Sequence, residues 1–131
     1  MAVGLSPVNM ANAILNIYRG TTFTGIATPF IQLHTSVGDP GVNGTSNISV
    51  GSTTRNAIVW TAAAASSITL STLSAWTNGG TSETISYVTL FSASSAGTFY
   101  QSFSLTTPQA WASTNTLTIT TFTLSITPLA A

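Results

Sequence analysis

The sequence predicts an all-β fold: an antiparallel sandwich or jelly-roll-like domain of about seven to eight strands with one short N-terminal helix. Ser and Thr make up about a third of the 131 residues, and Thr, Val, Ile, Phe and Trp suit the pleated surface of a sheet. Strong helix formers are few, and short alternating runs are separated by turn residues. We therefore expect a single β domain over residues 1–131, in which residues 1–20 form an arm and a helix.

The helix is predicted over about residues 6–19. Ser6 suits the N-cap position, Pro7 suits the first helical turn, and apolar residues follow at intervals of three and four. Arg19 falls in the last turn, where a cation interacts favourably with the helix dipole. Gly20 can end the helix in a left-handed conformation.

The strands are predicted from alternating apolar and polar residues after Gly20. In chain order they cover residues 28–35, 55–61, 68–73, 75–77, 84–91 and 97–105, followed by a long stretch at 114–128. The fifth and sixth runs are expected to form a hairpin through small turn residues. In the last stretch the alternation changes phase near Thr120 and Thr121, which indicates either a β-bulge or a crossing from one sheet to another.

A long loop is predicted at residues 42–54, which are rich in Gly, Asn and Ser. Loops of this length are often functional or ordered by a partner.

Charge is the scarcest feature of the composition. Only four side chains carry a formal charge at neutral pH, and Lys and Cys are absent; the four are Arg19, Arg55, Asp39 and Glu83. Arg55 and Glu83 each begin a strand and are expected to be solvated. Two arginines against two acids give no basic surface for nucleic acid, and no cysteine is present for disulfides. A neutral β protein tends to associate, so we expect a component of an assembly.

The same scarcity argues against an enzyme. Asp39 and Glu83 lie in separate turn-like contexts, and a Ser-His-Asp triad could use only His34 and Asp39. No Gly-x-Ser-x-Gly motif marks a nucleophile, and His34 is expected to bond to the loop after its strand. One His and two isolated acids do not complete a metal site. The sequence therefore predicts no catalytic residues, metal or cofactor.

Two further patterns have alternative interpretations. Trp60, Trp76 and Trp111 could form a platform for sugar rings, as in a carbohydrate-binding module, although core or interface packing is favoured. Thr at nearly every second position in residues 114–127 is similar to an ice-binding ladder, but a solvent-facing strand explains it without a ligand. No sequence repeat supports the ladder.

Neither a secretory signal nor an apolar run approaching 18 residues is found in the chain. We therefore expect synthesis in a bacterial cytoplasm and no membrane span.

Several stretches resemble small virion proteins of tailed phages of actinobacteria. The resemblance covers most of residues 1–105 and rests on Met1–Ser6 before the helix, Ile31–Thr35, Gly38–Gly41, Thr53–Arg55, and Glu83–Phe91 followed by the small residues Ser92–Gly97. It implies a non-enzymatic structural protein of the virion. Such proteins either decorate the head or belong to the tail or its fibres.

The absence of a repeat or a coiled coil favours a minor capsid or decoration protein, with a tail or tail-fibre component as the alternative. The expected partners are the major capsid protein lattice and copies of the chain itself, as a trimer. The residues expected at these contacts are Val3, Leu5, Val42, Ile48, Val50 and Trp111.

Overall fold

A curled antiparallel sheet accounts for most of the chain in the computed structural model, which describes residues 3–127. Eight strands occur in this range: β1 (Phe30–Thr35), β2 (Asn56–Trp60), β3 (Ser67–Leu73), β4 (Trp76–Thr77), β5 (Glu83–Phe91), β6 (Phe99–Trp111), β7 (Thr116–Leu117) and β8 (Thr123–Ser125). Six of them form one sheet in the order β6-β5-β1-β2-β3-β8, and β4 pairs with β7 in a small second sheet. The prediction of an all-β fold with one short N-terminal helix is confirmed.

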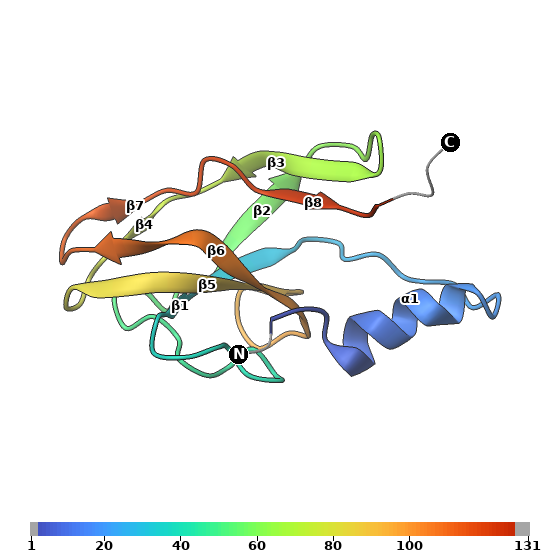
Figure 1. Ribbon diagram of the computed structural model, residues 1–131, viewed down its shortest axis with the longest axis horizontal. Coiled ribbons are helices and arrows are strands. Elements are labelled where there is room, and N and C mark those ends of the chain that lie inside the picture. The colour runs from blue at the N-terminus through green and yellow to red at the C-terminus, as the bar shows by residue number, and fades with distance from the viewer. Residues whose placement is uncertain (1–2, 128–131) are drawn as a thin grey trace.

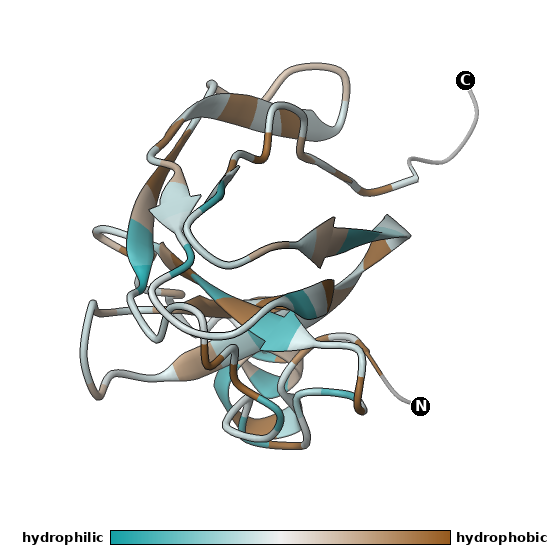
Figure 2. Ribbon diagram, turned by 90° about the vertical axis from the view of Figure 1, so that its left-hand side faces the viewer, coloured by the Kyte–Doolittle hydropathy of each residue, from teal (hydrophilic) through white to brown (hydrophobic). Residues whose placement is uncertain are grey.

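The two layers of the fold come largely from the same sheet. Figure 1 shows β5 and β6 in one layer and β3 and β8 in the other, with β2 running between the layers. Figure 2, turned by 90°, shows the sheet curling round, with hydrophobic and hydrophilic residues mixed along the strands. The curl brings β6 and β8, the two end strands of the sheet, onto facing sides of the molecule.

The core lies inside this curl. Its buried members are Ile31, Leu33, Ile58, Trp76, Ile85, Val88, Leu90, Trp111 and Leu117. Trp60, Phe103 and Phe122 pack against it from three different parts of the chain. The ring of Phe122 meets the other two edge to face, with centroids 5.1 Å from Trp60 and 4.9 Å from Phe103. These contacts hold the C-terminal segment against both β2 and β6.

The predicted helix is present as two short pieces, η1 (Pro7–Ala11) and α1 (Asn12–Ile17). Ser6 is the N-cap and accepts a hydrogen bond from the backbone N–H of Asn9 at 3.3 Å, and Gly20 has the left-handed φ of 77°. Arg19 lies beyond the last helical turn instead of within it. The five residues of η1 form a π-helical turn, which is wider than an α-helical turn. Neither η1 nor α1 has a buried residue.

The end of the chain differs most from the predicted strands. β6 continues from Phe99 to Trp111, six residues beyond the expected end, because β5 remains available as its partner. The stretch expected at 114–128 is instead broken into β7 and β8. The phase change at Thr120 and Thr121 falls in this break, where the chain passes from the small sheet to the large one. Residue 128 lies outside the described residues.

Candidate functional site

The long loop at residues 42–54 is held by Glu83, the first residue of β5. The Oε1 atom of its carboxylate accepts a hydrogen bond from the Ser49 hydroxyl and another from the Gly51 N–H at 3.1 Å, and Oε2 accepts from the Val50 N–H at 3.1 Å. The carboxylate thus accepts hydrogen bonds from two neighbouring backbone N–H groups of the loop, which would otherwise need other partners. The expectation that Glu83 would be solvated is therefore wrong.

Arg55 holds the other end of this loop. Its Nε donates to the side-chain oxygen of Gln32 at 3.0 Å, and Nη1 donates to the carbonyl oxygens of Ala93, at 3.3 Å, and Ala96. The guanidinium also lies over the ring of Phe91, 3.5 Å from its centroid. Arg55 thus joins the start of β2 to the turn between β5 and β6, and it too is not the solvated charge that was expected.

His34 is fully buried between β5 and the loop. Its Nδ1 lies 2.8 Å from the carbonyl oxygen of Ser46, and its Nε2 lies 2.8 Å from the Thr89 hydroxyl. Burial lowers the pKa of His34 below its ordinary value, which favours the neutral ring. The predicted bond between His34 and the loop is confirmed.

The remaining acid has a turn role. The Oδ1 atom of Asp39 accepts a hydrogen bond from the Gly41 N–H at 2.9 Å. Both ring nitrogens of His34 are directed at other groups, so the two residues do not form the catalytic pair considered above. Glu83, Arg55 and His34 therefore fix the loop and its end on the sheet, whereas Asp39 stabilises the turn before the loop.

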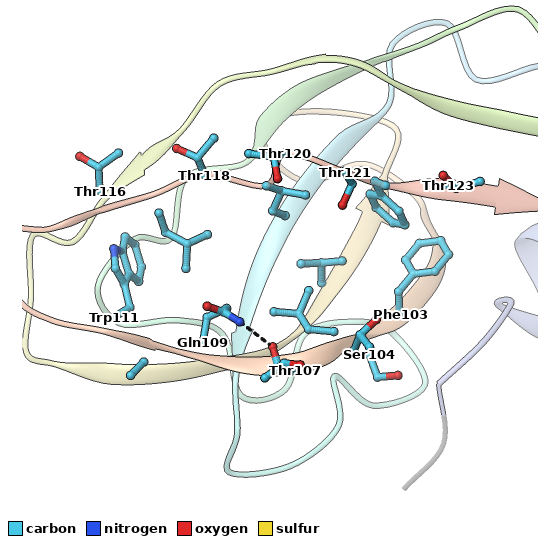
Figure 3. A pocket seen from close by; sticks show the side chains of 17 residues that line it. Phe103, Ser104, Thr107, Gln109, Trp111, Thr116, Thr118, Thr120, Thr121 and Thr123 are labelled. Atoms are coloured by element: carbon cyan, nitrogen blue, oxygen red, sulfur yellow. Dashed lines mark hydrogen bonds between the residues drawn. The ribbon is translucent and has the colours of Figure 1, made fainter.

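A groove of about 840 Å³ lies between β6 and residues 116–123. Figure 3 shows Gln109 and Thr121 projecting into the groove from its two walls, while Thr116 and Thr118 project away from it. Trp111 lies at one end, and the contact between Phe103 and Phe122 lies at the other.

The groove has an apolar floor and polar walls. Leu105, Leu117 and Ile119 are half-buried or buried beneath it, whereas most of the Thr, Ser and Gln residues along it are exposed. The Gln109 amide donates to the carbonyl oxygen of Thr107 at 3.0 Å, which leaves its own carbonyl oxygen available. None of the seventeen lining residues is charged.

The sequence contains few features that predict this groove. The polar residues that line it come partly from the last third of β6, which extends past the predicted strand end. The opposite wall includes residues 118–122, where the alternation was expected to change phase through a β-bulge or a crossing between sheets. The phase change and the run of threonines both fall in this wall, but neither predicts a groove, and a solvent-facing strand explains the threonines without a ligand.

The tryptophans do not form a platform for a ligand. Trp76 and Trp111 are each 2% exposed, and their indole N–H groups donate to the carbonyl oxygens of Thr54 and Asn115, both at 2.9 Å. Trp60 is half-buried against Phe122. The favoured interpretation was core or interface packing, and the structure shows core packing for Trp76 and Trp111.

The residues predicted at contacts with partners lie in three regions. Val3 and Leu5 belong to the N-terminal arm, where Leu5 bridges to Gln101 on β6, and both are more than two-fifths exposed. Val42 and Val50 are exposed on the long loop, and Ile48 is half-buried. Trp111 is buried in the core, so very little of its surface is free in the isolated subunit. The role of these residues in an interface stays a prediction.

An apolar surface that was not predicted lies on the helix. Val8, Leu15 and Tyr18 are 75%, 62% and 87% exposed, respectively. Figure 1 shows α1 beside the end of the sheet instead of across one of its faces. The helical spacing of these residues, which usually marks a core-facing side, gave no sign that the side would remain uncovered.

Neither a metal site nor a membrane-spanning helix is found among residues 3–127. No group of three or more His, Asp or Glu side chains in this range could hold a metal ion. No helix in the same range is long and apolar enough to cross a membrane.

Comparison with protein families gives a match to residues 6–127, nearly the whole chain. The match identifies the chain as a structural protein of a bacteriophage virion. It belongs to the family described as "Podophage GP4 fiber I protein gp80". No curated protein matches the chain.

Proposed function

We propose that the protein is a non-enzymatic fibre component of a podophage virion. The observation that carries the proposal is the family match, which spans residues 6–127 and names a fibre protein. The match supports the tail-fibre alternative better than the minor capsid or decoration protein that the sequence favoured.

The structure of the subunit is compatible with this role. His34, Glu83 and Arg55 are engaged in contacts that hold the long loop and its ends, and they do not form a catalytic cluster with one another. The surface that remains carries little charge and includes the exposed apolar side chains of the N-terminal helix. Surfaces of this kind suit close contacts with neighbouring subunits, and a trimer remains the expected oligomer.

Counting the copies of this chain per particle tests the proposal. Quantitative mass spectrometry of purified particles would measure the ratio of this chain to the major capsid protein. A fibre component is expected at a few tens of copies or fewer, whereas a protein that decorates every lattice site is expected at hundreds. A count in the hundreds would contradict the fibre proposal and favour a decoration protein of the head.

A further inference from the structure

The groove between β6 and residues 116–123 has the properties of a binding site with no occupant among the described residues. Its volume of about 840 Å³ is within the range of ligand pockets, roughly 300 to 1,000 Å³. Nine of its seventeen lining residues are Thr, Ser or Gln, so its walls are more polar than those of an ordinary ligand pocket, while its floor is apolar.

The polar groups of the groove are donors and acceptors without charge. Seven of the lining residues are threonines, and Thr120 and Thr121 on one wall lie across from Thr107 and Gln109 on the other. No hydrogen bond within the described chain uses the hydroxyls of Thr120 and Thr121. A ligand with many hydroxyl groups could pair with both walls.

The absence of charge limits the class of ligand. An anionic ligand such as a phosphate or a sialic acid would lose water without gaining a cation, and a cationic ligand would lack a carboxylate. A fully apolar ligand would cover the wall hydroxyls without pairing them. Sugars have apolar C–H faces and neutral hydroxyls, which match the floor and the walls.

An inserted polypeptide strand fits the groove less well. Ile85 and Tyr87 on β5 pair with Gln109 and Ser104, so that residues 105–108 of β6 leave the ladder as a bulge. Pro108 lies in this bulge and has no N–H to donate. Bulges and proline are the features by which exposed sheet edges avoid pairing with another strand.

We propose that this groove binds a neutral oligosaccharide of about two to four sugar rings. Its biological setting rests on the proposed function, since a fibre is the part of the virion that would present such a groove to a surface. The groove itself is formed entirely by residues of a single copy of the chain.

The test uses the full chain on an array of neutral oligosaccharides, with sialylated and phosphorylated versions of the same sugars. We expect binding to one or more neutral oligosaccharides and no gain from the added anion. Gln109→Ala and Thr121→Val should each weaken this binding about tenfold, because each removes polar groups from one wall. Thr72→Val, at an exposed threonine on β3 outside the groove, is the matched control and should bind like the unmodified chain.

Three results would overturn the inference. They are no binding to any neutral oligosaccharide, binding only to charged sugars, and equal weakening by Thr72→Val. Circular dichroism and melting temperatures of all three variants confirm that the fold is kept, which is expected for exposed positions. Because the array uses the isolated protein, sugar binding together with a high copy number would reject the fibre proposal alone.

Discussion

Arg55 is one of only four charged side chains in the protein, and it makes several contacts at once. Its guanidinium contacts one side chain, two backbone carbonyls and one aromatic ring, from two separate segments of the chain, β1 and residues 91–96. A lysine has a single point of charge and cannot reproduce this planar set of contacts.

Replacement of Arg55 by Lys should therefore lower the free energy of unfolding by about 1 to 2 kcal/mol, measured by urea denaturation. The matched control is Arg19→Lys, because Arg19 is exposed and its side chain makes one hydrogen bond, to Asn16 at 3.2 Å. The control should change the free energy by less than about 0.5 kcal/mol. Equal effects of the two changes would show that the Arg55 contacts contribute nothing specific.

His34 makes the stability of the subunit depend on pH. In the unfolded chain its pKa is near the ordinary value of 6.5, and in the folded protein burial lowers the pKa, with a smaller lowering from the positive charge of Arg55. Below about pH 6.5 the unfolded chain takes up a proton that the folded chain resists, so the stability falls as the pH falls through this window. Above it, the full stability is present.

Urea denaturation at a series of pH values between about 8 and 5 measures this effect. His34→Gln should be less stable at every pH, because it loses the bonds to Ser46 and Thr89, but the part of the pH dependence that begins near 6.5 should disappear. If the variant keeps the same pH dependence as the unmodified chain, His34 is not its source.

At the scale of elements, the long loop depends on a glycine as well as on charges. Gly44 has a φ of 66°, and a Cβ atom built on it would collide with the ring of the buried Phe99. Because Gly44 has no side chain, the loop can approach β6 more closely than it could with any other residue type at this position.

Gly44→Ala should accordingly lower the free energy of unfolding by about 1 to 3 kcal/mol. Gly25→Ala is the matched control, because a Cβ atom at Gly25 meets nothing within 4 Å and its φ is not in the left-handed region. Thermal denaturation should show a lower melting temperature only for Gly44→Ala. A melting temperature unchanged by Gly44→Ala would contradict the close approach of loop and strand.

The helix, in contrast, should tolerate substitution of its apolar residues. Leu15 is 62% exposed, so Leu15→Ser should change the free energy of unfolding of the subunit by less than about 0.5 kcal/mol. Leu33→Ala, in the core, should cost about 2 to 5 kcal/mol. Urea denaturation of both variants measures the difference, and a large loss for Leu15→Ser would show that α1 is packed in solution.

The elements that could be predicted from the sequence are those with local signals. Ser6, Pro7 and Gly20 mark the ends of the helix by their own conformational preferences, and alternation marks β1 and β5. The sandwich was expected from the number of strands, but the order of the six strands depends on contacts between distant residues, which no local pattern encodes.

The candidate site could not be predicted for the same reason. The alternation ends near Leu105, whereas pairing with β5 carries β6 on to Trp111 through a bulge. The roles of Arg55 and Glu83 depend on the loop folding back over the sheet, so their positions at strand starts gave the wrong expectation. The phase change at Thr120 and Thr121 did indicate the crossing between sheets, which forms one wall of the groove.

At the scale of the whole molecule, the near absence of charge has two consequences. The few charged groups are used within the subunit, and the outside presents hydroxyls, amides and apolar side chains. Such a surface does not steer partners over long distances, and it suits close contacts in an assembly. This agrees with a structural protein of a virion and with the proposed place in a fibre.

The measurement that tests this account most directly is immunogold labelling of intact particles with antibodies against this chain. We expect gold at the fibres attached to the tail, with none over the faces of the head. Gold distributed over the head surface would contradict the fibre assignment and favour a decoration protein.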